Sequence, residues 1–335
     1  MLLHPAVLSL MLCSAVVGGI AVVAAAAGVT IAAGWDSEDS SRRQLARERR
    51  SLLVESGMKM VLGWQLLSLF LFVAAADHLH SLFAGAMCAA GTLNASPLGY
   101  PTLLVKIAVF VLCGLGLVVM RASQAAWATG LVRFKHLFVI GLAAALIVEN
   151  VIQIRYFTDL DPEIITSCCA TIFRAGSDGI GADLAGVSMA TSRMAFFGGF
   201  VLTVGAGTRY LVRGRSLALF AVQVLPLTIL AVIAVVSWIA PGFYQLPTHH
   251  CPFCLLSWRY GFVGHALYGA LALALVAGCG SWLVFSLRSL DRFACIKPGV
   301  ERRLCAASMV GFVVFSLIAL WPTVTSGVRL EGFLK

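Results

Sequence analysis

Eight long apolar runs divide this chain, and they constrain its fold more than any other feature. A run of about 18 or more apolar residues is long enough to cross the hydrocarbon core of a bilayer as one helix. Hydrophobic residues make up 60% of the chain and charged residues only 12%, about half the charged share of soluble domains. We therefore predict an all-α, polytopic integral membrane protein that is surrounded by the lipid bilayer and forms one helical domain over residues 1–335. The predicted spans lie at about 5–33, 57–76, 102–120, 136–154, 194–212, 216–240, 255–287 and 305–325.

Lysine and arginine are concentrated in alternate connections between these runs. The segments 35–60, 121–135, 213–215 and 288–303 hold sixteen of the 24 basic residues. Basic connections stay on the cytoplasmic side of a membrane. We therefore predict a multi-pass protein of the cytoplasmic (inner) membrane, with both termini and the opposite connections outside. The net charge of +9 concerns this topology, and no nucleic acid is expected as a partner.

Two connections are long enough to have structure of their own. Segment 35–56 mixes acidic and basic residues and is predicted to be an amphipathic helix on the cytoplasmic surface. Segment 155–193 is the longest outer loop, and its Asp-Pro-Glu motif at 161–163 is typical of a helix start. The short helix that it opens would contain Cys168 and Cys169. Adjacent helical residues point about 100° apart, so these two thiols are not expected to bridge each other.

The densest reactive cluster is His249-His250-Cys251-Pro252-Phe253-Cys254, at the predicted start of the seventh span. Two thiols three residues apart can close a disulfide or give two ligands to a soft metal. The positive N-terminal end of a helix favours the thiolate in either use. A single C-x-x-C also occurs as a static bridge or as two inert thiols. Its function must therefore be judged from where the other cysteines of the chain lie.

Five of the ten cysteines lie at or beyond the outer surface: Cys88, Cys168, Cys169, Cys251 and Cys254. Paired thiols in an oxidising compartment form disulfides by default. Five is an odd number, so one thiol is left over unless a metal or a second chain takes it. Because three separate connections bring cysteine to the same side, we expect one redox or metal centre there.

Other polar residues are candidates for the same centre. Asp77, His78 and His80 end the second span, either as ligands or a proton-handling group, or as an interfacial cap. Glu149 in the fourth span is an acid at membrane depth, which is a functional-site hypothesis by default. It would carry protons or contact a quinone headgroup, or else form an interhelical hydrogen bond that locks packing.

His265 follows Cys254 by eleven residues, so a continuous helix would place it on nearly the same face, roughly 16 Å deeper. A b-type haem needs two ligands at matching depth, and the histidines of this chain do not offer such a pair. No haem is therefore expected.

The segment Cys251-Pro-Phe-Cys254-Leu-Leu-Ser-Trp-Arg259-Tyr260 resembles the active segment of DsbB-type membrane disulfide oxidoreductases. The vitamin K epoxide reductase group shares the C-x-x-C pair and the use of quinone. The likeness covers about ten residues. It departs from the family in a later arginine, in eight spans where the family has four, and in Cys88 with Cys168-Cys169 in place of a plain second pair.

The resemblance implies a thiol–disulfide oxidoreductase that passes electrons to a membrane quinone. Cys251, expected to be the more exposed thiol, would exchange with Cys88, Cys168 or Cys169, and a soluble extracytoplasmic thiol protein would be the partner. Cys254 would face the quinone. Arg259 would stabilise the reduced ring, and His265 and Glu149 are further candidates for quinone contacts.

Two alternatives remain open. His249, His250, Cys251 and Cys254 form a nitrogen and sulfur set suited to Zn or Cu(I), with Asp77, His78, His80 and Cys88 as a second donor group. Such a set would make the chain a metal-binding or metal-transporting membrane protein. The other alternative is a non-catalytic membrane subunit whose outer disulfides hold its loops.

Overall fold

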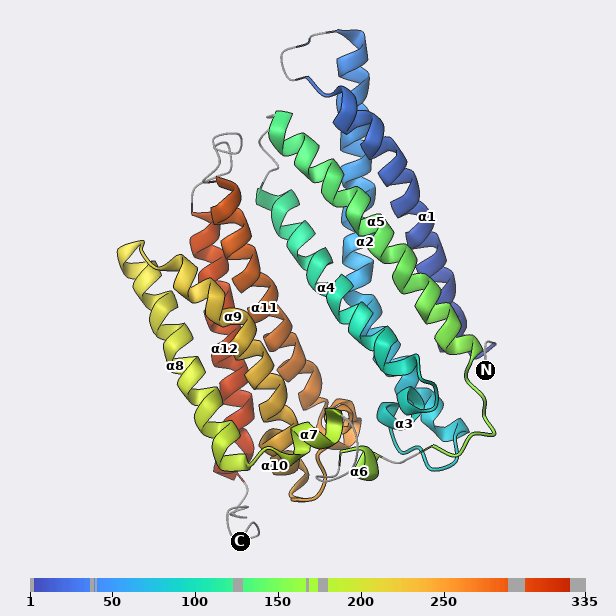
Figure 1. Ribbon diagram of the computed structural model, residues 1–335, viewed down its shortest axis with the longest axis vertical. Coiled ribbons are helices and arrows are strands. Elements are labelled where there is room, and N and C mark those ends of the chain that lie inside the picture. The colour runs from blue at the N-terminus through green and yellow to red at the C-terminus, as the bar shows by residue number, and fades with distance from the viewer. Residues whose placement is uncertain are drawn as a thin grey trace. The chain divides into compact units, whose positions relative to one another are not determined.

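The computed structural model describes residues 3–36, 39, 41–122, 129–166, 169–173, 180–288 and 299–325. All regular elements in these ranges are helices, and eight helical segments are long and apolar enough to cross a membrane. The prediction of an all-α polytopic membrane protein is therefore confirmed. The eight segments are α1 (Pro5–Gly34), α2 (Arg42–Leu79), α4 (Gly99–Ala122), α5 (Thr129–Thr158), α8 (Met189–Arg213), α9 (Leu217–Ala234) continuing into α10 (Ala240–Tyr244), α11 (Val263–Arg288) and α12 (Val300–Thr325) (Figure 1).

The outward faces of these helices are apolar. Val23 on α1, Leu202 on α8 and Leu317 on α12 are all exposed, as are many other large aliphatic side chains along the spans. In a bilayer such side chains face hydrocarbon, and the helix satisfies its backbone hydrogen bonds internally. Helices with apolar outer faces are thus the structure expected for long apolar segments that are surrounded by lipid.

The described chain divides into two compact units. Unit 1 comprises Met1–Ala75, Ala95–Pro162 and Leu283–Glu301, and it contains α1, α4, α5 and most of α2. In this unit α5 packs against both α1 and α4. The close packing of α1 depends on its glycines: a Cβ at Gly18 would lie 2.6 Å from Nδ2 of Asn150. Small residues at helix interfaces allow such close approach in lipid.

Unit 2 comprises Ala76–Asn94, Glu163–Trp282 and Arg302–Lys335. Its bundle is built from α8, α9, α11 and α12, around a core that includes Phe196, Phe220, Trp238, Phe312 and Phe315. Shorter elements belong to the same unit: α3 (Ala89–Asn94), α6 (Cys169–Ile172) and α7 (Ile180–Gly186). Figure 1 shows α7 and α10 at one end of this bundle.

Helices form in both long connections, but their bounds differ from the predicted ones. Most of segment 35–56 belongs to α2, which runs without a break from Arg42 into the second span. No helix opens at the Asp-Pro-Glu motif 161–163; the short helices of that loop begin at Cys169 and Ile180. Thr166, shortly after the motif, donates from its backbone N–H to the carbonyl of Ala84 at 3.0 Å.

Candidate functional site

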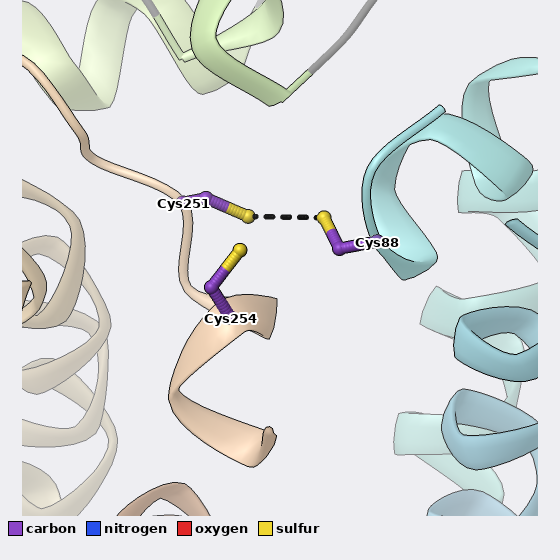
Figure 2. A group of neighbouring side chains, drawn as sticks. All are labelled: Cys88, Cys251 and Cys254. Atoms are coloured by element: carbon purple, nitrogen blue, oxygen red, sulfur yellow. Dashed lines mark hydrogen bonds between the residues drawn. The ribbon is translucent and has the colours of Figure 1, made fainter. Parts of the chain in front are cut away.

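Three cysteines from two distant segments of unit 2 bring their sulfur atoms together. The Sγ atoms of Cys88 and Cys251 are 3.5 Å apart, and those of Cys88, Cys251 and Cys254 all lie within 4.8 Å of one another. Figure 2 shows the three side chains pointing toward a common centre. A disulfide is about 2.05 Å long, so a shift of roughly 1.5 Å would bring Cys88 and Cys251 to bonding distance. The expected convergence of cysteines from separate connections is confirmed for these three.

Apolar side chains enclose this sulfur cluster. Cys251 is 0% exposed and Cys88 is 3% exposed, whereas Cys254 is partly exposed. The two buried cysteines pack with Ala90, Phe173, Ala185 and Val236. The expectation that Cys251 is the more exposed thiol of the pair is therefore wrong, and the order is reversed.

Hydrogen bonds to backbone carbonyls hold the segment that carries Cys251. Tyr244 on α10 donates its hydroxyl to the carbonyl of Cys251 at 2.6 Å, and Tyr268 on α11 donates to that of Pro252 at 2.7 Å. His250 Nδ1 lies 2.9 Å from the carbonyl of Val236, which sits in the π-helical turn Val235–Ile239. A π turn displaces carbonyls from regular α-helical pairing and recurs at functional sites. Contacts with α10, α11 and the π-helical turn thus hold this segment in place.

The C-x-x-C pair does not open the seventh span, contrary to the prediction. Two short 3-10 turns, Phe253–Leu256 and Trp258–Tyr260, follow Cys251, and α11 begins only at Val263. Two consecutive residues with positive φ break the helix, Gly261 at 63° and Phe262 at 55°. The N-terminal end of α11 therefore lies beyond the cysteines in sequence, and the argument that it favours their thiolates does not hold.

This break also changes the positions of the residues proposed to contact a quinone. His265 lies in the first turn of α11, where it is exposed and packs edge-on against Phe262 at 5.5 Å, so its expected position deep below Cys254 is wrong. Arg259 is exposed in the second 3-10 turn. Beside it in sequence, Trp258 is 71% exposed and Phe262 is 55% exposed.

Asp77 positions the segment that carries Cys88. Its Oδ1 accepts a hydrogen bond at 3.0 Å from the backbone N–H of Ala89, the first residue of α3. The first N–H groups of a helix have no partner within it, so this carboxylate acts as a cap. The Nδ1 of His80 contacts the carbonyl of Asp77, and His78 is exposed. The Asp77 carboxylate is thus bound to the backbone at the start of α3.

The histidines that the sequence suggested as metal ligands do not join the sulfur cluster. His249 packs edge-on against Tyr244 at 4.7 Å, and His250 is bound to Val236. Among the described residues, Cys88, Cys251 and Cys254 form the only group of three or more potential metal ligands close enough to share an ion. Cys168 lies outside the described residues, and the side chain of Cys169 at the start of α6 is likewise not described.

Glu149 belongs to a different site, which lies in unit 1. Its Oε1 accepts a hydrogen bond at 2.6 Å from Nζ of Lys106 on α4, and its Oε2 accepts one at 2.8 Å from Gln65 on α2. Lys106 also donates to Ser68 at 2.9 Å, and both members of the ion pair are almost completely buried. Sequence reasoning missed Lys106, although it is the one charged residue in the apolar run 102–120.

Comparisons with family models, with curated proteins and with solved structures found no match for this chain.

Proposed function

We propose that this chain is a membrane thiol–disulfide oxidoreductase whose reacting atoms are the sulfurs of Cys88, Cys251 and Cys254. The observation that supports it is the 3.5 Å approach of Cys88 to Cys251, together with the partly exposed Cys254 within the same cluster. A static bridge needs two cysteines. A third thiol within reach allows one disulfide to be exchanged for another.

The internal exchange is balanced without any outside oxidant. The Cys88 thiolate attacks Sγ of Cys251 in a Cys251–Cys254 disulfide, the Cys88–Cys251 bond forms, and Cys254 leaves as a thiolate. The proton given up by Cys88 is then available to Cys254. Cys251 is taken as the shared sulfur because its Sγ lies 3.5 Å from that of Cys88. Cys254, as the accessible thiol, is the one that meets an outside redox partner.

A membrane quinone is the proposed electron acceptor, and it would take two electrons and two protons as two thiols become a disulfide. The motif resemblance supports this choice. So do the exposed apolar rings of Trp258 and Phe262, which lie close to the exposed Arg259 in the sequence. Arg259 would bind the negative charge of the reduced ring. The electron donor would be a soluble thiol protein on the outer side of the cytoplasmic membrane, the side that the asymmetry of the basic connections favours for this site.

Disulfide mapping by mass spectrometry tests the exchange on purified protein in lipid nanodiscs. We expect Cys254→Ala to form a Cys88–Cys251 disulfide and Cys88→Ala to form a Cys251–Cys254 disulfide. Cys305→Ala, which removes a buried thiol elsewhere in unit 2, should leave both forms accessible. If Cys88 never pairs with Cys251 or Cys254 under any redox condition, the proposal fails.

Quinone coupling is measured separately, as the loss of quinone absorbance when reduced protein is mixed with a soluble quinone. Arg259→Ala should slow this reaction. Arg209→Ala, which removes an exposed arginine on α8, should not. If the two variants react at equal rates, Arg259 does not take part in the quinone reaction.

A further inference from the structure

The sulfur cluster also has the dimensions of a metal site. Thiolate sulfurs lie about 2.3 Å from a bound ion such as zinc, so three of them arranged as a triangle around one ion are about 4 Å apart. Here the Sγ atoms of Cys88 and Cys251 are 3.5 Å apart, and all three sulfurs lie within 4.8 Å of one another. Side-chain adjustments of less than about 1 Å would therefore let all three bind one ion.

We propose that the reduced cluster binds a single thiophilic ion, Cu(I), through Cys88, Cys251 and Cys254. Structural zinc sites are almost always tetrahedral with four ligands. Among the described residues, no histidine or carboxylate joins the three sulfurs, and Nδ1 of His250 is already bound to Val236. Soft thiolate ligands select Cu(I), and its filled d shell accepts three ligands in a plane. The donor set thus favours monovalent copper over zinc.

The surroundings of the cluster suit such an ion. Phe173, Ala185 and Val236 pack against the buried cysteines and keep water from the site. A hydrophobic shell controls solvent access to a metal. Cys254 is only partly buried, so it provides the point of entry. Binding displaces thiol protons, so affinity for the ion rises with pH.

Metal binding and disulfide formation exclude each other in this cluster. Any disulfide between two of the three cysteines leaves a single sulfur, which cannot hold the ion alone. The oxidised protein should therefore bind no copper at this site, and the copper-loaded protein should not exchange disulfides. Copper binding by the reduced form is measured without any exchange reaction. The copper proposal is therefore tested independently of the oxidoreductase proposal.

The test is an anaerobic titration of the reduced protein in nanodiscs with Cu(I), against a chromogenic Cu(I) chelator. We expect one tightly held equivalent in the wild type, and its loss in Cys88→Ala, Cys251→Ala and Cys254→Ala. Cys305→Ala is the matched control and should keep the equivalent. Oxidised wild type, with its disulfide confirmed by mass spectrometry, should bind none.

X-ray absorption at the copper edge identifies the ligands. Three sulfur neighbours at about 2.3 Å would support the site, and a nitrogen or oxygen neighbour would overturn the three-thiolate assignment. Retention of copper in any one of the three cysteine variants would overturn it as well. If the reduced protein takes up Zn²⁺ and not Cu(I) in the same titration, the choice of metal is wrong. Disulfide mapping on metal-free protein reports on the oxidoreductase in every one of these cases.

Discussion

Two buried polar clusters in this chain are built in opposite ways. In unit 1, Lys106, Glu149 and Gln65 come from three spanning helices and form a charged, hydrogen-bonded group. In unit 2, the sulfur cluster lies on connections between helices, and the Sγ atoms of Cys88 and Cys251 approach to 3.5 Å. The first cluster is held by its own charges, and the second is held by hydrogen bonds to the neighbouring backbone.

The difference follows from the cost of each group. A buried charge is stable only when it is paired and fully hydrogen-bonded, which requires rigid elements on all sides. A neutral thiol has no such requirement and can sit on a segment that shifts by an ångström. Reactive atoms that must change partners are better placed on anchored loops, whereas a fixed ion pair suits the spans. We therefore expect mutations in unit 1 to affect stability and mutations in the sulfur cluster to affect reactivity.

The largest expected effect is the loss of stability in Lys106→Met. Removing one partner of a buried ion pair leaves an uncompensated charge and costs about 3–5 kcal/mol. The free energy of unfolding is measured by denaturant titration in detergent micelles. The double variant Lys106→Met/Glu149→Met should recover most of the loss, because no buried charge then remains.

Lys135→Met is the matched control for that experiment. The Lys135–Glu55 pair has a similar distance, 2.7 Å, but Glu55 is 15% exposed. Water therefore reaches the remaining carboxylate, and the loss of stability should be smaller. Equal losses in the two single variants would show that burial does not govern the cost. Alkylation of Cys254 in the folded fraction should be the same in all these proteins.

The second effect concerns the reactivity of the two thiols in the C-x-x-C pair. In reduced protein we expect Cys254 to be alkylated at least about ten times faster than Cys251, a difference equivalent to about 1.4 kcal/mol. Cys254 is partly exposed, whereas Cys251 is fully buried and reacts only after local opening. Rates are followed by mass spectrometry of quenched samples. Faster labelling of Cys251 would contradict the structure of this segment.

The spans could be predicted from sequence because hydrophobic length is a local property. The first predicted span, 5–33, differs by one residue from α1 (Pro5–Gly34). The convergence of Cys88 with the C-x-x-C pair was also predictable, since alternate connections of a polytopic chain lie on the same side. Both predictions needed only the order of apolar and polar segments.

The details of the site depend on contacts that no local pattern reveals. The burial of Cys251 follows from hydrogen bonds donated by Tyr244 and Tyr268, which flank it on separate helices. The late start of α11 follows from positive φ at Phe262, a conformation that is rare for a bulky residue. Lys106 was missed because its partner Glu149 lies 43 residues away on another span.

The smallest expected effect, and the sharpest test of how a loop holds a reactive thiol, is Asp77→Ala. Loss of its cap on Ala89 should cost about 1 kcal/mol and loosen the segment that presents Cys88. Disulfide formation between Cys88 and Cys251, measured in a Cys254→Ala background, should become slower, because the two sulfurs spend less time in contact. Asp77→Asn is the matched control: its amide oxygen still accepts the hydrogen bond from Ala89, so the rate should stay close to that of the parent. If Asn slows pairing as much as Ala does, the charge of Asp77 matters more than the cap. If neither variant changes the rate, Cys88 is positioned by the packing of Ala90 and Phe173 around it.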